Sequence, residues 1–498
     1  MLLSLSFLLF PSFILTATYA RVHQAANTRH RSQPDARFLP KHPTCAAIEE
    51  AISSASSVYY FPDIAFITDN YHYMPSSSQN SECSVEPGAV DDVAKIMEIL
   101  SNSTTPFGVK GGGHSSNPGF SSTPGVLIVM TRFNNVNYRV QEGTADIQTG
   151  VIWDDVYAAL APHGVNVVGG RASGVGVAGL TLGGGYSWLT NLYGLTVDTV
   201  VAFELVLPNG TVVEARDDRY PDLFFGLKGG LNNFGIVTRF TLRTFPQTQV
   251  WAGVIMYSGL VWERTVDAVY AFIASNTDPN ANILAAYTVA GGVQVMPLLV
   301  FYNRPQPPSK LFDNFFNIPH LSSTVGTKDF LDFVKEAPSN VTANLRGAFH
   351  TVPLANITPA VLNKIVSEAK LWGLQSLLAA GISVSYDVEP FLRTITRHAA
   401  SSAYPHDKFA SPLLLYFEWP PSISDSTLIN AMKASASSIA AVAKGEGQDL
   451  DSLASYPNYC LADTPLERMY GSNLDTLRAI KKKYDSSNVM GRAGGFKF

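Results

Sequence analysis

Three glycine-rich segments constrain the fold of this chain more than any other feature of its sequence. They lie at 108–115, 169–185 and 226–237 and read GVKGGGHS, GGRASGVGVAGLTLGGG and GLKGGLNNFGIV. Glycine leaves peptide N–H groups bare, so a bulky anion can approach the backbone closely. Three such segments within about 130 residues predict an elongated cofactor that is contacted mainly by backbone.

The first segment places two reactive side chains beside its glycines. Lys110 precedes the three glycines with a positive charge, and His114 follows them with a nucleophilic ring nitrogen. A diphosphate held by backbone amides, with a histidine at its edge, is a cofactor site in outline. For this segment taken alone, a surface turn with an incidental histidine is an equal alternative.

The second segment contains a literal G-x-G-x-x-G at Gly174, Gly176 and Gly179. In a dinucleotide-binding βαβ unit this pattern opens a helix whose N-terminus faces the pyrophosphate. Here Leu180-Thr181-Leu182 is followed at once by three more glycines, which are expected to break a helix. We therefore predict an extended loop lying along a large ligand.

The 498 residues are too many for one core and predict two or three domains. Up to Pro246, short strands alternate with turns and short helices. Between 250 and 450 the strands and helices lengthen, which is typical of an antiparallel sheet backed by helices and of the α+β class. The predicted helices include 45–57, 91–100 with Asp91 as N-cap, 153–163 closed by Gly164, 262–275, 358–372 and 466–483.

The N-terminus and the cysteines indicate a secreted protein. Residues 1–20 predict a signal peptide with cleavage before Arg21, the alternative being a membrane anchor. Four Asn-x-Ser/Thr sequons occur, at Asn102, Asn209, Asn340 and Asn356. Of the three cysteines, Cys45 and Cys83 are candidates for a disulfide, which leaves Cys460 unpaired.

Charge and composition exclude several classes of partner. The formal net charge is −5 and there is no basic block, which argues against nucleic acid or an anionic membrane as a stable partner. No C-x-x-C and no His/Cys cluster with zinc spacing occurs, so no metal site is predicted.

Taken together, the motifs resemble a known family. KGGGHS, GVGVAGLTLGGG, GGLNNFGIVT and the C-terminal Tyr470-Gly-Ser-Asn473 are similar to the berberine bridge enzyme-like branch of the vanillyl-alcohol-oxidase flavoproteins, in particular to secreted fungal FAD-linked oxidoreductases. The resemblance implies a PCMH-type FAD-binding domain in two parts, 21–250 (core about 79–250) and 451–498. The inserted segment 251–450 is then the substrate domain.

The resemblance also implies that FAD is bonded covalently to His114. Bicovalent relatives carry a second bond from a cysteine whose place is taken here by Ala172, so His114 is expected to be the single link. Val175 occupies the place said to control oxygen access, and a small valine there is associated with oxidases. The residues implied to hold FAD are Lys110, Gly111, Gly112, Gly113, His114, Ser115, Val175, Gly176, Gly179, Gly183, Gly184, Gly185, Gly235, Ile236, Val237, Tyr470 and Asn473.

Four side chains are candidates for catalysis. Tyr456 and Tyr459 lie in a segment that resembles the family's Y-x-N-Y-x-D motif, although Cys460 replaces its expected charged residue. Tyr416 and Glu418 stand two apart on a predicted strand and so share one face. A phenol in water has a pKa near ~10, so a tyrosine base needs a nearby cation. Lys408 and Arg393 are the candidates for that charge.

These features predict an FAD-linked oxidase. Hydride passes from a small-molecule substrate to the flavin, and O2 is the acceptor that yields H2O2. Because the cysteine link is missing, we favour a secondary-metabolite intermediate as substrate. The alternatives are a carbohydrate oxidase, a flavin-dependent cyclase or dehydrogenase with poor oxygen reactivity, and, least favoured, an extracellular binding module.

Overall fold

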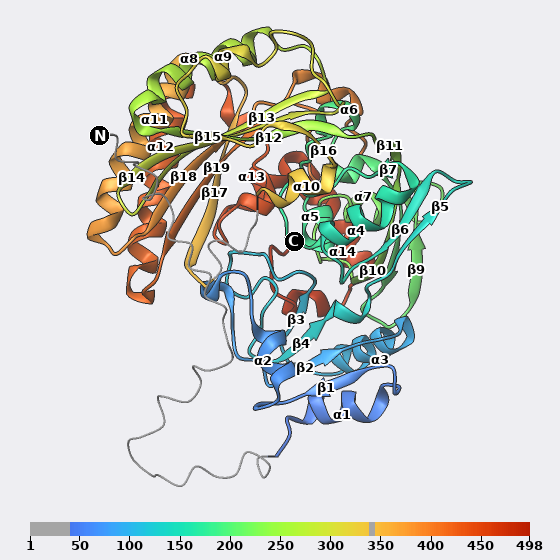
Figure 1. Ribbon diagram of the computed structural model, residues 1–498. Coiled ribbons are helices and arrows are strands. Elements are labelled where there is room, and N and C mark those ends of the chain that lie inside the picture. Colours follow the sequence, from blue (N-terminus) through green and yellow to red (C-terminus); the bar gives the residue numbers. More distant parts are fainter. Residues whose placement is uncertain (1–39, 338–343) are drawn as a thin grey trace, which may run out of the picture. The chain divides into compact units, whose positions relative to one another are not determined.

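In the computed structural model, which describes residues 40–337 and 344–498, the strands before residue 250 form small sheets and those after it form one large sheet (Figure 1). Residues 41–498 make up one compact unit. The predicted α+β class is confirmed. The domain boundaries at 250 and 450 stay a prediction, and the predicted signal peptide and the Asn340 sequon lie outside the described residues.

The first sheet is mixed and carries the first glycine-rich segment. Strands β2 and β3 both run parallel to β4, whereas β1 is antiparallel to β2. The strands, in spatial order, are β1 (Ser57–Tyr59), β2 (Cys83–Glu86), β4 (Val126–Val129) and β3 (Phe107–Lys110). The helices of this region are α1 (Pro43–Ala51), α2 (Ile64–Asn70) and α3 (Val90–Ser101).

Two predictions in this region are wrong in detail. Helix α1 ends at Ala51, six residues before the predicted end, and its C-cap Ile52 is already extended. Helix α3 begins at Val90 after Ala89, so Asp91 lies in its first turn, not at the N-cap. A carboxylate in the first turn also interacts favourably with the helix dipole, which explains why Asp91 resembles a capping residue in the sequence.

The third glycine-rich segment leads into β10 (Ile236–Arg243), the central strand of the second sheet. The strands of this sheet, in order, are β5 (Val136–Arg139), β6 (Thr144–Gln148), β10, β8 (Val200–Val206) and β9 (Val212–Ala215), and a separate pair joins β7 (Val165–Asn166) to β11 (Phe245–Pro246). The predicted β8–β9 hairpin is confirmed. Its helices are α4 (Trp153–Leu160), α5 (Val177–Leu182), α6 (Thr190–Tyr193) and α7 (Pro221–Leu227). As predicted, Gly164 closes the α4 region with φ of 65°.

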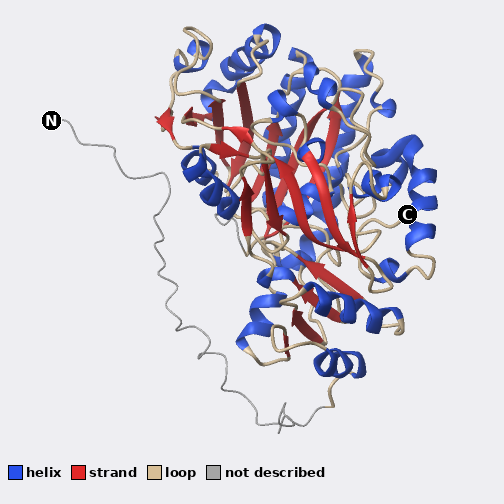
Figure 2. Ribbon diagram, turned by 90° about the vertical axis from the view of Figure 1, so that its right-hand side faces the viewer, coloured by secondary structure: helices blue, strands red, loops and turns tan. Residues whose placement is uncertain are grey.

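The large sheet is antiparallel and is built from residues 250–419. Its strands are β12 (Val250–Ser258), β13 (Ala281–Ala290), β14 (Val293–Tyr302), β15 (Ser322–Ser323), β16 (Gly326–Lys328), β17 (Arg346–Leu354), β18 (Ser383–Val388) and β19 (Ser411–Trp419), in the order β15-β12-β14-β13-β18-β19-β17 with β16 also on β12. Helices flank these strands (Figure 2). Helices α11 (Pro359–Leu378) and α12 (Asp425–Gly445) pack on the sheet, and α8 (Trp262–Ser275) packs on α11 and, through Trp262, on Tyr287 of β13. Shorter helices are α9 (Asp313–Phe316) and α10 (Phe330–Lys335).

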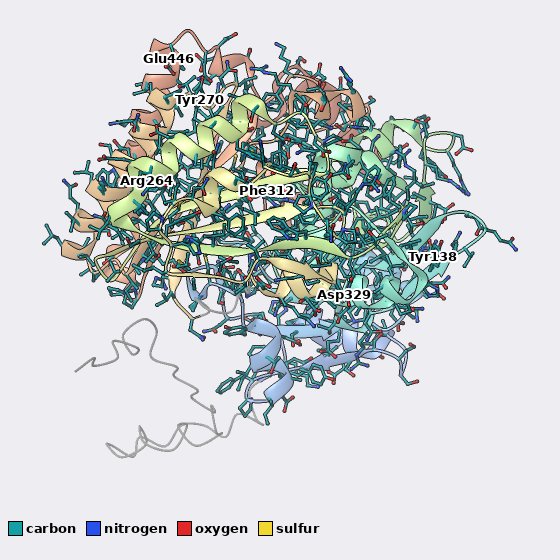
Figure 3. The ribbon with its side chains drawn as sticks, turned by 45° about the horizontal axis from the view of Figure 1, so that its top comes forward. Tyr138, Arg264, Tyr270, Phe312, Asp329 and Glu446 are labelled. Atoms are coloured by element: carbon teal, nitrogen blue, oxygen red, sulfur yellow. A yellow bond between two sulfur atoms is a disulfide. The ribbon has the colours of Figure 1, made fainter. Side chains whose placement is uncertain are left out.

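Helix α8 shows why this layer forms. Trp262, Val269 and Phe272 recur on one side of the helix and are buried, whereas Arg264 and Tyr270 lie on the outer side (Figure 3). This is the spacing of an amphipathic surface helix. The buried side packs on a core that includes Phe312, whose ring stacks on Phe272. The predicted bounds of this helix are confirmed.

The predicted C-terminal helix is interrupted. It comprises α13 (Leu466–Tyr470) and α14 (Leu474–Tyr484), with Gly471 between them at φ of 49°. Glycine adopts this left-handed conformation readily, so the chain turns there. Among the described residues, no helix is both long and apolar enough to cross a bilayer.

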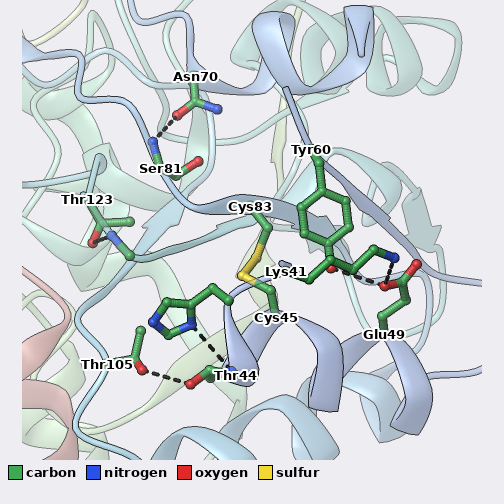
Figure 4. The surroundings of a disulfide bond; sticks show 12 residues. Lys41, Thr44, Cys45, Glu49, Tyr60, Asn70, Ser81, Cys83, Thr105 and Thr123 are labelled. Atoms are coloured by element: carbon green, nitrogen blue, oxygen red, sulfur yellow. Dashed lines mark hydrogen bonds and ion pairs between the residues drawn. A yellow bond between two sulfur atoms is a disulfide. The ribbon is translucent and has the colours of Figure 1, made fainter. Parts of the chain in front are cut away.

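A disulfide joins Cys45 of α1 to Cys83 of β2, as predicted (Figure 4). The two Cα atoms are 6.2 Å apart and both side chains are buried among the apolar residues between α1, α3 and the first sheet. Cys460 is a buried free thiol. Burial raises the pKa of Cys460 to about 12, so it stays protonated and unreactive.

We predict that this disulfide stabilises the fold by lowering the conformational entropy of the unfolded chain. For a loop of 38 residues the chain-entropy relation gives about 3–4 kcal/mol. Replacing Cys45 and Cys83 together by alanine should lower the melting temperature measured by calorimetry. Reductant should lower it in the parent protein but not in the double variant. A reductant effect of equal size in both proteins would contradict the prediction.

Candidate active site

The first glycine-rich segment leaves β3 and passes directly under the second. A Cβ built on Gly112 would lie 2.6 Å from the Cα of Gly176, and a Cβ on Gly176 would lie 2.5 Å from the N of Gly112. Real side chains do not reach such distances, so the two backbones approach this closely only because both residues are glycine. Gly112 and Gly179 remain exposed at this crossing. Bare backbone is thereby presented to a ligand.

Helix α5 corrects the prediction of an extended loop at 174–185. Gly176 precedes the helix, and Gly183 ends it by donating its N–H to the carbonyl oxygen of Gly179. The three glycines do not prevent the helix; they stop it after six residues. Gly184 and Gly185 then turn with φ of 120° and 85°.

Lys110 does not face this exposed backbone, which corrects its predicted role against the cofactor. Its Nζ donates to the carbonyl oxygens of Asp69 at 2.7 Å and Tyr71 at 2.6 Å, with a longer contact to Thr68. An ammonium group has three donors, and all three are directed at the end of α2. Lys110 therefore holds α2 against the glycine-rich segment.

The third segment is braced by the C-terminal residues. The hydroxyl of Tyr470 donates to the carbonyl oxygen of Gly229, and Asn233 donates to the carbonyl oxygen of Phe496. Asn473 donates to the carbonyl oxygens of Ser402 and Ala403, and so contacts this region indirectly. Gly235 is required because a Cβ there would lie 2.3 Å from the carbonyl oxygen of Val206. Ile236 and Val237 continue as β10.

His114 lies beside the exposed glycine backbone and is surrounded by other side chains of the protein. Burial lowers the pKa of His114 to about 4, so the imidazole is neutral at physiological pH. A neutral ring keeps a lone pair on one nitrogen and can act as a nucleophile. The ring of Tyr73 stacks on it with centroids 4.2 Å apart, and Phe349 of β17 lies 6.3 Å away.

The large sheet presents two of the four predicted catalytic residues to the same place. Tyr416 of β19 pairs in register with Phe349 of β17 and packs against its ring at 4.8 Å. The Tyr416 hydroxyl donates to Glu418, and it lies 3.0 Å from the Tyr73 hydroxyl. Tyr416 and Glu418 thus share one face, as predicted, and that face meets His114 through Phe349 and Tyr73.

Tyr459 stands next to this pair and belongs to a buried ionic network. Its hydroxyl accepts a hydrogen bond from Arg171 at 2.8 Å and donates to Glu389 at 3.0 Å. Arg171 and Glu389 form a salt bridge of 2.7 Å. Burial, with the Glu389 charge, raises the pKa of Tyr459 far above its usual value, against the lowering effect of Arg171. Tyr459 therefore remains protonated.

The cation beside the tyrosine is Arg171, which replaces the two candidates predicted from the sequence. Arg393 lies over the ring of Phe409 and donates to the carbonyl oxygen of Ala355. Lys408 lines a separate small cavity. The Arg171 guanidinium, in contrast, bonds both the tyrosine and its carboxylate partner.

Tyr456 is not placed to touch a substrate. It is buried, and its hydroxyl accepts hydrogen bonds from the N–H of Gly185 at 3.2 Å and from Asn458 at 2.9 Å. Its ring packs against Tyr186 and Tyr404. Tyr456 instead supports the glycines that end α5.

The remaining predicted residues contribute local hydrogen bonds and backbone conformation around the site. Ser115 Oγ accepts the N–H of Asn117, and the Val175 carbonyl accepts the N–H of Trp153. Val175 is partly exposed and directly precedes the Gly112–Gly176 crossing. A Cβ on Gly111 would lie 3.2 Å from Ala178, and Gly113 has φ of 66°.

Sequence reasoning missed four residues of the site: Tyr73, Arg171, Asp387 and Glu389. Three of them had a readable signal. Ser385 and Asp387 alternate along β18 and Glu389 directly follows its last residue, which continues the spacing of one sheet face, and Arg171 is the only cation in the second glycine-rich segment. Tyr73 had no such signal, because its role depends on contacts with distant residues.

These donors fit FAD. Exposed glycine backbone suits a diphosphate, and a neutral histidine at its edge suits attachment of the flavin ring. The FAD binding domain family matches residues 81–216, and the "Berberine and berberine like" family matches residues 455–491. A relative named FAD-dependent monooxygenase yanF, from Aspergillus niger, is 30% identical over 452 residues, covering 88% of this chain and 75% of that protein. The chain belongs to the berberine bridge enzyme-like family of FAD-linked oxidoreductases.

Other matches agree with this berberine bridge enzyme-like assignment. FAD-dependent monooxygenase drtC from Aspergillus calidoustus is 29% identical over 477 residues, covering 91% of this chain and 90% of that protein. The solved structure of Physcomitrella patens BBE-like 1 superposes with a TM-score of 0.75 at 21% identity, covering 90% of this chain and 97% of that one. The PCMH-type fold and the FAD-dependent oxidoreductase class are thereby established for this berberine bridge enzyme-like chain.

Asp387 gives this berberine bridge enzyme-like site a titratable group close to neutrality. It accepts a hydrogen bond from Ser385 at 2.5 Å. Burial above all, together with the charges of Glu389 and Glu418, raises the pKa of Asp387 to about 7, against the lowering effects of Ser385 and Arg171. Asp387 is therefore partly protonated at neutral pH.

We predict that Asp387 makes the fold less stable at alkaline pH. Between the ordinary aspartate pKa of 3.8 and the raised pKa of about 7, the folded state holds a proton that the unfolded state has lost, so the free energy of unfolding falls as pH rises. Asp387→Asn should raise the melting temperature by roughly 2 °C at pH 8 and leave it unchanged at pH 4. Asp218→Asn, at an exposed position, is the matched control. A gain of equal size at both pH values would contradict the prediction.

Proposed function

We propose that this protein is an oxidase that removes hydride from a small-molecule substrate and uses O2 as acceptor, with H2O2 as product. Bound FAD supplies the redox chemistry by accepting the hydride and passing two electrons to dioxygen. The observation that carries the proposal is that Phe349 packs against His114 and also against Tyr416 and Tyr459, each of which is hydrogen-bonded to a carboxylate, Glu418 and Glu389 respectively. Val175 beside Gly176 supports access of oxygen, since it is small and partly exposed.

Tyr459 and Glu389 provide the proton transfer. Because the pKa of Tyr459 is raised, a standing phenolate is disfavoured. A substrate O–H or N–H proton therefore passes to the Tyr459 oxygen as the tyrosine's own proton passes to Glu389. Arg171 stays charged, since the carboxylate of Glu389 raises its pKa, and it holds both partners in place. Tyr416 and Glu418 then bind and orient the substrate.

The substrate class is proposed from two features. Ala172 stands where bicovalent relatives carry cysteine, which favours a secondary-metabolite intermediate over a carbohydrate. The site-facing strands carry Ser385, Asp387 and Glu418, which suit a substrate with hydroxyl or amine groups. A carbohydrate oxidase is the second candidate. A dehydrogenase or cyclase with poor oxygen reactivity would release little peroxide.

Other parts of the structure support secretion of the protein and its division into two domains. The buried Cys45–Cys83 disulfide fits an oxidising compartment, and the sequon residues Asn102, Asn209 and Asn356 are exposed. We propose that residues 21–250 and 451–498 form the FAD-binding domain and 251–450 the substrate domain. The contacts of Tyr470 and Asn233 with distant partners support this division.

The function is tested by measuring H2O2 against O2 consumed over a panel of alcohols, amines and oligosaccharides. Equal amounts support an oxidase. Because the named relatives are called monooxygenases, 18O2 is used to look for labelled product. Incorporated label, or anaerobic flavin reduction without aerobic peroxide, would overturn the oxidase proposal.

We predict that FAD is held by a single covalent bond, to His114. Protein precipitated with acid should stay yellow, and His114→Ala should release all flavin. His163→Ala, an exposed histidine far along the chain, is the matched control. Peptide mapping should find flavin on the peptide that contains His114. A flavin-labelled cysteine peptide would show that Ala172 does not mark a monocovalent enzyme.

We predict that Tyr459→Phe slows substrate oxidation by about 10²-fold, the usual range for loss of a general acid–base group. The phenyl ring keeps the packing against Phe349 and Tyr456 but removes the hydroxyl between Arg171 and Glu389. Stopped-flow measurement separates the two half-reactions. Reduction of the flavin should slow, and its reoxidation should not change. Equal slowing of both halves would point to a general structural defect.

A further inference from the structure

Tyr73 connects three parts of the site. It follows α2 in the segment 71–82, and its N–H donates to the carbonyl oxygen of Gly113 at 3.1 Å. Its ring stacks on His114, and its hydroxyl lies 3.0 Å from that of Tyr416. The glycine-rich segment, the histidine and the large sheet are therefore all contacted by one side chain.

The orientation of the His114 ring depends on stacking. Among residues 40–337 and 344–498, no hydrogen bond to a His114 ring nitrogen is found. The Tyr73 ring lies 4.2 Å from it at an interplanar angle of 20°, whereas Phe349 is tilted by 33° at 6.3 Å. Aromatic contact at the shorter distance restricts rotation of the imidazole about its own bond to the chain. Tyr73 is thus the main restraint on the plane of this ring.

The Tyr73 ring is itself held at its far end. Tyr416 has one hydroxyl proton, which it donates to Glu418, so its oxygen accepts the proton of Tyr73. Glu418 is buried, with 2% of its surface exposed. The direction of these hydrogen bonds is fixed from Tyr73 through Tyr416 to the carboxylate, and the hydroxyl keeps the ring against His114.

We propose that Tyr73 is a positioning residue for covalent attachment of the flavin to His114. This inference rests on the proposed His114 linkage. Attachment forms a C–N bond and breaks one C–H of the flavin 8α-methyl and one N–H of the imidazole. The two protons and two electrons released pass through the flavin to O2, which becomes H2O2. The stack directs the neutral nitrogen lone pair toward the methyl group before the bond forms.

The stack and the hydroxyl are separable by mutation. Tyr73→Phe keeps the aromatic ring and loses the hydrogen bond to Tyr416. Tyr73→Leu loses the ring but keeps an apolar side chain of moderate size, and Tyr73→Met repeats that comparison if leucine disturbs the packing. Tyr71→Leu is the matched control, because Tyr71 is 46% exposed two residues away and holds Lys110 only through its backbone carbonyl.

The experiment measures the rate at which acid-stable flavin forms after FAD is added to full-length protein produced under riboflavin starvation. Total bound flavin, measured before precipitation, shows that each variant still binds FAD. Tyr73→Leu should attach flavin at least about tenfold more slowly than the parent protein, since misorientation of a reacting group by about 1 Å reduces rates this much or more. Tyr71→Leu should match the parent protein, and Tyr73→Phe should attach flavin faster than Tyr73→Leu because it keeps the stacked ring.

Two outcomes would overturn the proposal. Attachment at the parental rate in both Tyr73→Leu and Tyr73→Met would show that the stack does not position His114. Slow attachment in Tyr73→Phe equal to that in Tyr73→Leu would assign the effect to the hydroxyl, not to the ring. Failure of the underlying linkage is distinguishable from both, because parent protein that binds FAD would then form no acid-stable flavin.

Discussion

The contact between the backbones of Gly112 and Gly176 is the constraint on which the site depends. Atoms at this crossing are so close that neither position has room for a methyl group. The first segment carries His114 two residues later, and the second carries Arg171 five residues earlier. Fixing one crossing therefore fixes two reactive groups that come from different strands and loops. A substitution there would move both, whatever its effect on the core.

The site joins an apolar support to a polar working face. Helices α11 and α12 pack on the large sheet, and α8 packs on α11. Other positions of β18 and β19 carry Asp387, Tyr416 and Glu418, and Tyr416 contacts Tyr73 and Phe349, the two rings that lie beside His114. Alternation along a strand separates these two environments without any change of main-chain direction. The sheet thus positions on one face polar side chains that, without it, would have to come from several separate loops.

Much of this arrangement is predictable from sequence, and the failures have physical reasons. Periodicity predicts α8 and the β8–β9 hairpin, and glycine clusters indicate a backbone-lined cofactor site. The role of Lys110 is not predictable because its partners, the carbonyl oxygens at the end of α2, come together only in the folded chain. Tyr73 escapes prediction for the same reason, since its role depends on contacts with residues more than 40 positions away. Arg171 can be recognised as the cation of its segment, but its partners Tyr459 and Glu389 cannot. The local sequence pattern indicates which functional groups a segment contains, but not which distant residues they contact in the folded chain.

The bracing of the third glycine-rich segment has a consequence for biosynthesis. Gly229 and Asn233 are contacted by Tyr470 and Lys481, which are translated about 240 residues later. At about 5–20 residues per second, this delay amounts to roughly 12–50 s on the ribosome. During that time the nascent chain holds all three glycine-rich segments but lacks the residues that order the last one. The third glycine-rich segment therefore gains its native contacts only when synthesis is nearly complete.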